Sequence, residues 1–242
     1  MILFIGDLNC HYWLVNHIIG AAEKQFKDNV TAVVQLGDFG IFKAPLDAWF
    51  NSKSGNSFIK PVYFIDGNHE DFLFFESLTG TYSRHFTYLP RGSVHKLDDF
   101  NFLCLGGAAY MDPVNTPSGS VIRDIDIEKC LSHSPESVDI ILTHDCPSDI
   151  GVPGNPGFEY CGPTGFPKSR LLRSRFKQKT WLFAHHHRFF EYSDSHGSCF
   201  GLPEAHNGFA VMDKNGHVTM VENRIKREGT SRQQSVCLQG PV

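Results

Sequence analysis

The fold is decided at residues 61–70, which read PVYFIDGNHE. The first five residues are mostly apolar, β-branched or aromatic, which is typical of a buried strand, and Gly67 marks the turn that ends it. An amide, an imidazole and a carboxylate follow at Asn68, His69 and Glu70. Loops after the carboxyl ends of strands are where α/β proteins collect ligands and chemistry. Taken alone, the stretch is equally well explained as an ordinary polar β-turn.

The same arrangement, an apolar strand followed by a polar donor, recurs four more times along the chain. The strands are expected at 2–5, 30–36, 138–142 and 181–183. The donors that follow them are Asp7 with Asn9, Asp38, His144, and His185 with His187. A single histidine or aspartate after a strand is more often structural. Five such strand ends together argue against coincidence and favour a shared site.

The remaining elements follow from the spacing of apolar residues. A β–α–β order over the first seventy residues predicts parallel strands joined by crossover helices. Helices are expected at 12–29, 46–58, 71–78 and 169–177, with Asp126 capping a further short helix. An antiparallel hairpin is expected at 94–97 and 100–105, and edge strands of a second sheet at 209–212 and 218–221. The Pro- and Gly-rich stretches 111–123 and 146–167 predict loops, and the longer one is a candidate lid.

Composition narrows the class of protein. The 242 residues carry a formal net charge of −4, which argues against generic nucleic-acid binding, although a basic run at 168–179 leaves a local contact open. The ordinary interpretation of that run is a solvated helix face. Seven scattered cysteines without a Cys-x-x-Cys pair indicate neither a zinc knuckle nor a secreted disulfide framework. With no signal-peptide pattern and no apolar run of membrane-spanning length, we expect reduced thiols, a cytoplasmic location and no membrane partner.

The donor set predicts the kind of ligand. It comprises two carboxylates, two amides and three imidazoles, with no thiolate. Such donors suit divalent ions of intermediate hardness, namely Mn²⁺, Fe²⁺, Co²⁺ or Zn²⁺. The thirteen histidines of the chain agree with a metal or acid–base site.

In their order along the chain these motifs resemble those of the calcineurin-like metallophosphoesterases. They stand here as Gly6-Asp7-Leu8-Asn9, Gly37-Asp38, Gly67-Asn68-His69-Glu70, His144 and Ala184-His185-His186-His187. The resemblance covers residues 1–225 as one catalytic domain, followed by a polar tail at 226–242 that we expect to be poorly ordered. It implies a four-layer α/β/β/α sandwich of two mixed β-sheets flanked by helices.

The resemblance also implies a role for each position. One metal ion would be held by Asp7, Asn9, Asp38 and His187. The other would be held by Asp38, Asn68, His144 and His185, so that Asp38 bridges the two. His69 would be the catalytic imidazole beside the metals, and His186 would be turned away from them. The partner that orients His69 stays open between Asp66, Glu70 and Asp145.

Three positions depart from the commonest family pattern. Asn9 stands where a histidine is more usual, and His11 is an alternative ligand there. A carbonyl oxygen in place of an imidazole hardens the site, which favours Mn²⁺ or Fe²⁺ over Zn²⁺, Co²⁺ or Ni²⁺. Ala184 replaces a glycine and restricts the turn. Residues 37–40 lack the further acidic residue of the protein-phosphatase members, which argues against a protein phosphatase.

The function implied is hydrolysis of a phosphate ester by attack of a metal-bridging hydroxide, with a phosphodiester favoured over a phosphoprotein substrate. Two alternatives stay open. One is a small-molecule phosphomonoesterase, and the other is a catalytically silent scaffold of the same fold that binds protein partners. The intact donor set with His69 favours the enzyme, because a scaffold has no need to keep those residues.

Overall fold

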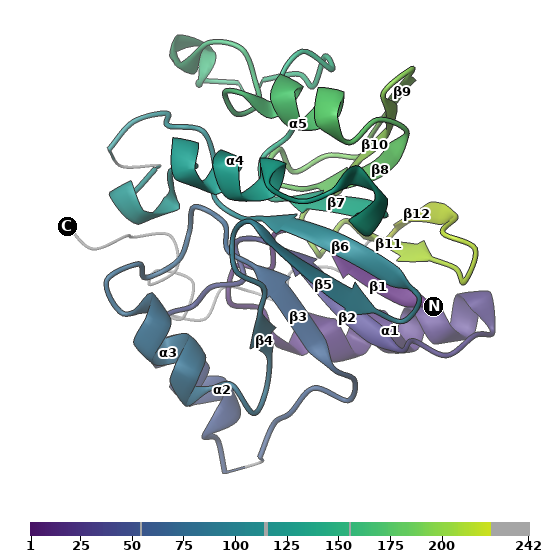
Figure 1. Ribbon diagram of the computed structural model, residues 1–242. Coiled ribbons are helices and arrows are strands. Elements are labelled where there is room, and N and C mark those ends of the chain that lie inside the picture. Colours follow the sequence, from purple (N-terminus) through teal and green to yellow (C-terminus); the bar gives the residue numbers. More distant parts are fainter. Residues whose placement is uncertain (54, 114–115, 155, 224–242) are drawn as a thin grey trace.

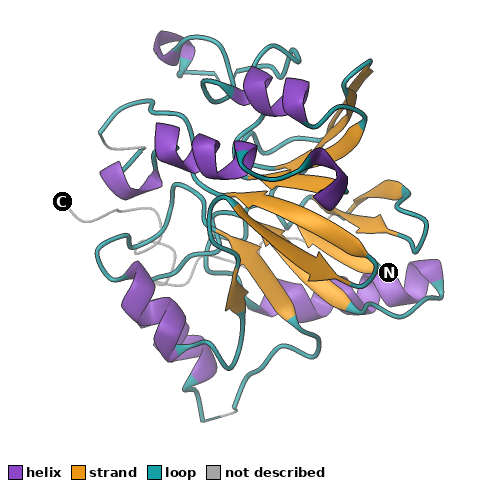
Figure 2. Cartoon of the chain, viewed as in Figure 1, coloured by secondary structure: helices purple, strands orange, loops and turns teal. Residues whose placement is uncertain are grey.

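The computed structural model describes residues 1–53, 55–113, 116–154 and 156–223. Its strands form two six-stranded mixed sheets that pack face to face, with helices on the outer sides (Figures 1 and 2). This is the four-layer α/β/β/α architecture that the resemblance implies, and that prediction is confirmed.

The first sheet has the strand order β12-β11-β1-β2-β3-β4. Its strands β1 to β4 run parallel, whereas β11 pairs antiparallel with β1 and β12 antiparallel with β11. Leu3 pairs with Val33 and Val33 with Val62, which sets the register of the first three strands. The strands are β1 (Ile2–Ile5), β2 (Ala32–Leu36), β3 (Val62–Ile65), β4 (Thr87–Tyr88), β11 (Gly208–Met212) and β12 (Val218–Glu222).

The second sheet has the strand order β5-β6-β7-β8-β10-β9. Strands β6, β7, β8 and β10 run parallel, and the two edge strands pair antiparallel with their neighbours. The strands are β5 (Ser93–Leu97), β6 (Phe100–Leu105), β7 (Ile140–Thr143), β8 (Lys179–Phe183), β9 (Phe190–Asp194) and β10 (Gly197–Gly201).

The helices divide between the two outer faces (Figure 1). Those on the first sheet are α1 (Trp13–Phe26), α2 (Lys43–Phe50) and α3 (Phe75–Thr81). Those on the second are α4 (Asp124–Leu131) and α5 (Ser169–Arg175). Short 3₁₀ turns lie at Ser118–Ser120, Pro135–Ser137 and Glu159–Cys161.

Three apolar layers hold these elements together. Phe4, Leu36, Phe102 and Leu142 are among the fully buried residues between the two sheets. A second cluster joins α1 and α2 to the outer face of the first sheet, and a third joins α4 and α5 to the second sheet. Because β1, β3 and β7 are largely buried on both faces, they are continuous apolar runs rather than alternating ones.

Three predicted features differ from the structure, and a fourth is confirmed at a different position. Helix α2 ends at Phe50, not at 58, because the polar, Gly-containing stretch 51–57 cannot continue the apolar stripe. Helix α3 begins at Phe75 rather than 71. Asp126 caps α4 as predicted, but from the third helical position rather than as the N-cap residue, which is Arg123; its Oδ2 accepts the backbone N–H of Arg123. The strands at 208–212 and 218–222 belong to the first sheet, where β11 pairs with β1.

Other expectations concern the cysteines, the membrane and the tail. Cys104, Cys130, Cys146, Cys161 and Cys199 are free thiols, as expected for these five. In the described part of the chain no helix has the length and apolar character needed to cross a membrane. The predicted tail at 226–242 lies outside the described residues.

Candidate metal centre

The five predicted strand ends meet at one edge of the molecule. Asp7 follows β1, Asp38 follows β2 and Asn68 follows β3. His144 comes directly after β7, and His185 lies two residues after the end of β8. The first three belong to one sheet and the histidines to the other, so the site spans the interface of the two sheets. Parallel strands deliver their carboxyl ends to the same edge, which is why residues far apart in sequence converge.

Asp38 is the hub of the site. Its Oδ1 accepts the backbone N–H groups of Asn68 and His69, each at 2.8 Å, and lies 3.4 Å from His144 Nε2. Its carbonyl oxygen accepts the N–H groups of Leu8 at 3.0 Å and Asn9 at 2.8 Å. Asp38 therefore ties the turn after β1 and the turn after β3 to the end of β2.

Two glycines allow this close approach. A Cβ on Gly37 would lie 2.2 Å from His144 Nδ1, and one on Gly67 would lie 2.1 Å from Asp38 Oδ1. Gly37 also has a φ of +91°, which side-chain-bearing residues rarely adopt. The glycines that precede Asp38 and Asn68 are thus required by the packing of the site itself.

His144 is fixed by hydrogen bonding. Its Nδ1 lies 2.7 Å from the Leu36 carbonyl oxygen, and because a carbonyl can only accept, Nδ1 carries the proton. Nε2 faces Asn68 Oδ1 at 3.0 Å, a contact that requires either a proton on Nε2 or a cation shared between the two atoms. Burial opposes a charged ring, but the carboxylates of Asp38 and Asp7 outweigh it and raise the pKa of His144.

Asp7 binds the turn after β8. Its Oδ2 accepts the backbone N–H of His185 at 3.1 Å, while His187 Nε2 lies 3.4 Å from Oδ1 without hydrogen-bond geometry. Burial alone would favour the protonated carboxyl, yet His187 holds the pKa of Asp7 well below its usual range. Asp7 in turn raises the pKa of His187 to about 9 against the effect of burial. Burial lowers the pKa of His185 to about 4, so this ring is neutral near pH 7.

The residues present fit divalent metal ions. Donor atoms of Asp7, Asp38 and His144 lie within 4.8 Å of one another, and all three side chains are buried. Asp7 Oδ1 is buried and makes no hydrogen bond. Two carboxylates this close inside a protein are costly unless a cation neutralises them. The mixture of oxygen and nitrogen donors without sulfur is the chemistry that divalent transition ions accept.

The other predicted residues lie around this group. Asn9 has a φ of 48° and is bound to Asp38 through its backbone N–H. His11 Nδ1 lies 3.1 Å from the Leu8 carbonyl oxygen, and its ring packs edge-on against His206 at 4.7 Å. His69 is half-buried, next to Asn68, and is positioned by its N–H bond to Asp38. His186 Nε2 lies 3.0 Å from Asp145 Oδ1 rather than beside Asp7 or Asp38.

The three carboxylates considered as partners of His69 have other roles. Glu70 accepts the backbone N–H groups of residues 39, 40 and 41 and so holds the turn that follows Asp38. Asp66 binds Arg91 and the Tyr88 hydroxyl. Asp145 binds His186 and the backbone N–H groups of Ala109 and Cys146. None of the hydrogen bonds described for these carboxylates reaches the His69 ring.

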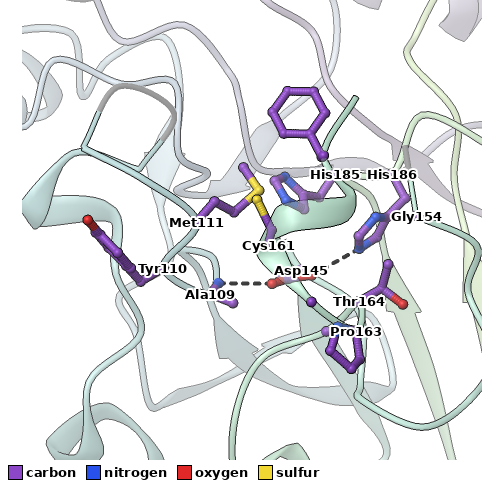
Figure 3. Close-up of a pocket in the computed structure, with 13 residues that line it drawn as sticks. Ala109, Tyr110, Met111, Asp145, Gly154, Cys161, Pro163, Thr164, His185 and His186 are labelled. Atoms are coloured by element: carbon purple, nitrogen blue, oxygen red, sulfur yellow. Dashed lines mark hydrogen bonds and ion pairs between the residues drawn. The ribbon is translucent and has the colours of Figure 1, made fainter. Parts of the chain in front are cut away.

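Two features of the site have no clear signal in the sequence. Arg91, a lone arginine in a loop, links Asp66 to the carbonyls of residues 119–121. A cavity beside His185 is walled by residues 109–111 and by parts of the loop 154–165 (Figure 3). The sequence predicts that loop as a candidate lid, but its contact with residues 109–111 depends on tertiary packing.

Three of the six basic side chains in the run at 168–179 form ion pairs. Lys168 lies 2.6 Å from Asp124, Arg170 2.6 Å from Asp149 and Arg173 2.7 Å from Asp194. These ion pairs favour the interpretation of a solvated helix face over a nucleic-acid contact.

Comparisons with known proteins agree with this geometry. Among solved structures, the protein TT1561 of Thermus thermophilus has a TM-score of 0.57 and 10% identity, covering 91% of this chain and 97% of that one. A candidate 5′-nucleotidase from Staphylococcus aureus has a TM-score of 0.56 and 11% identity, covering 98% of this chain but 57% of that one. Such low identities show a shared fold and no more. A search of curated proteins gave no match. A sequence model described as calcineurin-like phosphoesterase matches residues 1–197, and the chain therefore belongs to that family.

Proposed function

We propose that this protein is a metal-dependent phosphoric ester hydrolase that acts on a phosphodiester. The observation that carries the proposal is the buried Asp7 Oδ1, which makes no hydrogen bond and lies within 4.8 Å of donor atoms of Asp38 and His144. The carboxylates concentrate negative charge that His187 balances in part and that divalent cations would neutralise more fully. Family membership supports the same reaction class.

The residues that would hold two ions are those assigned from the motifs. One set is Asp7, Asn9, Asp38 and His187, and the other is Asp38, Asn68, His144 and His185. When bound, two divalent ions activate water and stabilise the charge of the phosphoryl group during displacement. Because Asn9 contributes an amide oxygen, we propose Mn²⁺ or Fe²⁺ rather than Zn²⁺.

The protein groups supply orientation and proton transfer. The bond from His144 Nδ1 to Leu36 directs Nε2 toward the site. Asn68 adds a donor oxygen without a negative charge that would repel an anionic substrate. The His69 backbone N–H is bound to Asp38 Oδ1, which fixes the backbone of His69 next to the donors, and its imidazole would protonate the departing oxygen.

A phosphodiester is favoured over a phosphoprotein for a reason in the sequence. Phe39 and Gly40 follow Asp38 where protein phosphatases of this family carry a further acidic residue. Both are buried here, and the Phe39 ring packs 4.8 Å from that of Phe64. The turn after Asp38 therefore offers no additional carboxylate to a protein substrate.

The test is hydrolysis of chromogenic mono- and diesters by the purified chain with added Mn²⁺. We expect turnover of bis(p-nitrophenyl) phosphate, and we expect His69→Ala to keep its bound metal while losing about 10²- to 10⁴-fold in kcat. His196→Ala, at an exposed histidine of the β9–β10 hairpin, is the matched control and should retain the parent rate. A His69→Ala variant as active as the parent contradicts the role of His69. A parent that binds metal but hydrolyses neither ester supports the scaffold alternative.

A further inference from the structure

A cavity of about 90 Å³ lies against the metal centre. Figure 3 shows Met111 and Cys161 with their sulfur atoms toward one another, close to His185, and the pair of Asp145 and His186 beside them. Phe158 also lines the cavity. This is less than the roughly 150 Å³ of an enclosed apolar cavity that binds benzene, but the cavity is partly open to solvent, so a single six-membered ring can enter it without being wholly enclosed.

The cavity and the metal centre share His185. This residue lines the cavity, its ring lies 4.9 Å from that of His144, and its backbone N–H is bound to Asp7. A molecule whose phosphate lies among the metal donors can therefore extend its organic part past His185 into the cavity. The inference rests in this respect on the proposed function.

The lining shows what kind of group the cavity would accept. Met111, Phe158 and Cys161 provide apolar, polarisable walls, and thioethers make favourable contacts with aromatic rings. The carboxylate of Asp145 is already satisfied by the N–H groups of Ala109 at 2.9 Å and Cys146 at 2.7 Å and by His186. The cavity thus offers shape and apolar surface rather than an unpaired charge.

Hydrogen bonds hold its walls in place. The Tyr160 hydroxyl donates to Asp112 Oδ2 at 2.8 Å and joins the loop at 154–165 to the loop at 109–113. The Thr164 hydroxyl donates to the Val152 carbonyl at 2.6 Å, and the Phe166 N–H donates to the Cys146 carbonyl at 3.2 Å. A cavity formed before the ligand arrives spares the cost of ordering these loops on binding.

We propose that this cavity is the subsite for the organic group of the phosphate ester, and that it selects a single flat six-membered ring, an aryl group or a pyrimidine. A small alkyl group leaves the cavity unfilled. The reaction itself is unchanged; the cavity decides which esters the metal centre receives.

The test compares the binding of phenylphosphonate and methylphosphonate to the Mn²⁺-loaded chain by titration calorimetry. The two probes present similar phosphonate groups and differ in the ring, and neither depends on turnover. We expect phenylphosphonate to bind at least about tenfold more tightly, the discrimination that an apolar pocket typically gives. Equal affinities would overturn the inference.

Two variants change the cavity in opposite ways. Ala109→Leu fills it while keeping the backbone bond to Asp145, and Met111→Ala removes one wall. Either should lower the preference for the phenyl probe by about threefold or more with little change in methylphosphonate affinity. Leu171→Ala, half-exposed on α5, is the control and should leave the preference intact. A preference unchanged in both cavity variants would contradict the proposal.

Hydrolysis of bis(p-nitrophenyl) phosphate, measured on the same preparations, reports separately on the proposed function. Ring-selective binding without any turnover would support the subsite and contradict the esterase. Turnover with equal affinity for the two phosphonates would support the esterase and contradict the subsite.

Discussion

Several of the candidate metal-donor residues have a backbone conformation that is unusual for residues with a side chain. Asp38, His185 and His187 have φ values of 55°, 65° and 55°. Left-handed conformations of this kind cost about 1 kcal/mol or more and persist where surrounding contacts enforce them. Here the Asp38 carbonyl accepts two N–H groups and the His185 N–H is bound to Asp7. These hydrogen bonds hold the turns in the left-handed conformation.

His85, which lies away from the candidate site, should make the free energy of unfolding depend on pH. The His85 ring stacks on Phe50 at 4.1 Å, and its Nε2 accepts a hydrogen bond from Arg84 at 2.9 Å. Burial and, to a smaller extent, the neighbouring Arg84 cation lower the pKa of His85 from its usual value of 6.5. The unfolded chain therefore binds this proton more readily, so His85 reduces the free energy of unfolding as the pH falls below its unfolded pKa.

His85→Phe keeps the stacked ring and removes the titratable group. We expect the loss of unfolding free energy between about pH 7.5 and about pH 5.5 to be smaller in this variant than in the parent. Urea denaturation at the two pH values measures it. An identical loss in the two proteins would show that His85 does not contribute to the pH dependence.

At the scale of elements, Arg91 is a connection between the two sheets that lies near the site. Its guanidinium is 10% exposed and binds Asp66, which follows β3, through Nε at 3.0 Å and through Nη2. It also donates to the carbonyls of Gly119, Ser120 and Val121, which precede α4. Because Asp66 directly precedes the Gly67-Asn68-His69 turn, this clamp supports the loop that supplies two site residues.

Removing the arginine should be costly. Arg91→Gln leaves the buried carboxylate of Asp66 without its counter-ion, and we expect a loss of about 3–5 kcal/mol in the free energy of unfolding. Arg170→Gln, which breaks a pair whose members are 73% and 50% exposed, is the control and should cost less than about 1 kcal/mol. The double variant Asp66→Asn with Arg91→Gln should recover part of the loss, because the unpaired charge of Asp66 is removed, while Asp126 still lacks its 3.5 Å ion pair with Arg91. Urea denaturation provides the three values, and a double variant less stable than Arg91→Gln would contradict a charge-based explanation.

The elements that sequence reasoning located correctly are those with a local signal. The strands around Leu3, Val33 and Phe64 read as apolar runs, and their order predicts parallel pairing. The assignment of 208–212 and 218–222 to the wrong sheet has a different cause. Their patterns say that they are strands, but pairing of β11 with β1, some two hundred residues away, is decided by tertiary packing. Strands β4, β9 and β10 are short or largely polar and give no clear period.

The same distinction between local sequence signals and tertiary packing applies to the site. The donors themselves could be predicted because each stands at the end of a recognisable strand, and the structure brings Asp7, Asp38 and His144 within 4.8 Å. The hydrogen bonds of Glu70 and Asp145 could not be predicted, because their partners depend on how loops from different sheets pack.

At the scale of the whole molecule, the site joins the two sheets. Asp7, Asp38 and Asn68 follow strands of the first sheet, and His144 and His185 follow strands of the second. The two sheets otherwise contact each other through the apolar layer around Phe4 and Phe102. An ion bound by both sets would cross-link the sheets. Unfolding separates these donors, so the ion binds the folded chain far better than the unfolded one and stabilises it by mass action.

Removal and return of metal should therefore change the stability of the entire domain. At a free Mn²⁺ concentration about 100 times its dissociation constant, the gain is about 2.7 kcal/mol. For a domain of this size, each kcal/mol corresponds to roughly 2–4 °C in Tm, so Mn²⁺ added to chelator-treated protein should raise Tm by about 5–10 °C. Asp38→Asn removes the proposed bridging carboxylate and should abolish most of the rise, whereas Asp149→Asn, at an exposed loop carboxylate, should keep it. Differential scanning calorimetry measures all three proteins. Equal shifts in both variants would mean that Mn²⁺ acts elsewhere on the surface, and Asp38 would then have to be assigned to folding rather than to metal binding.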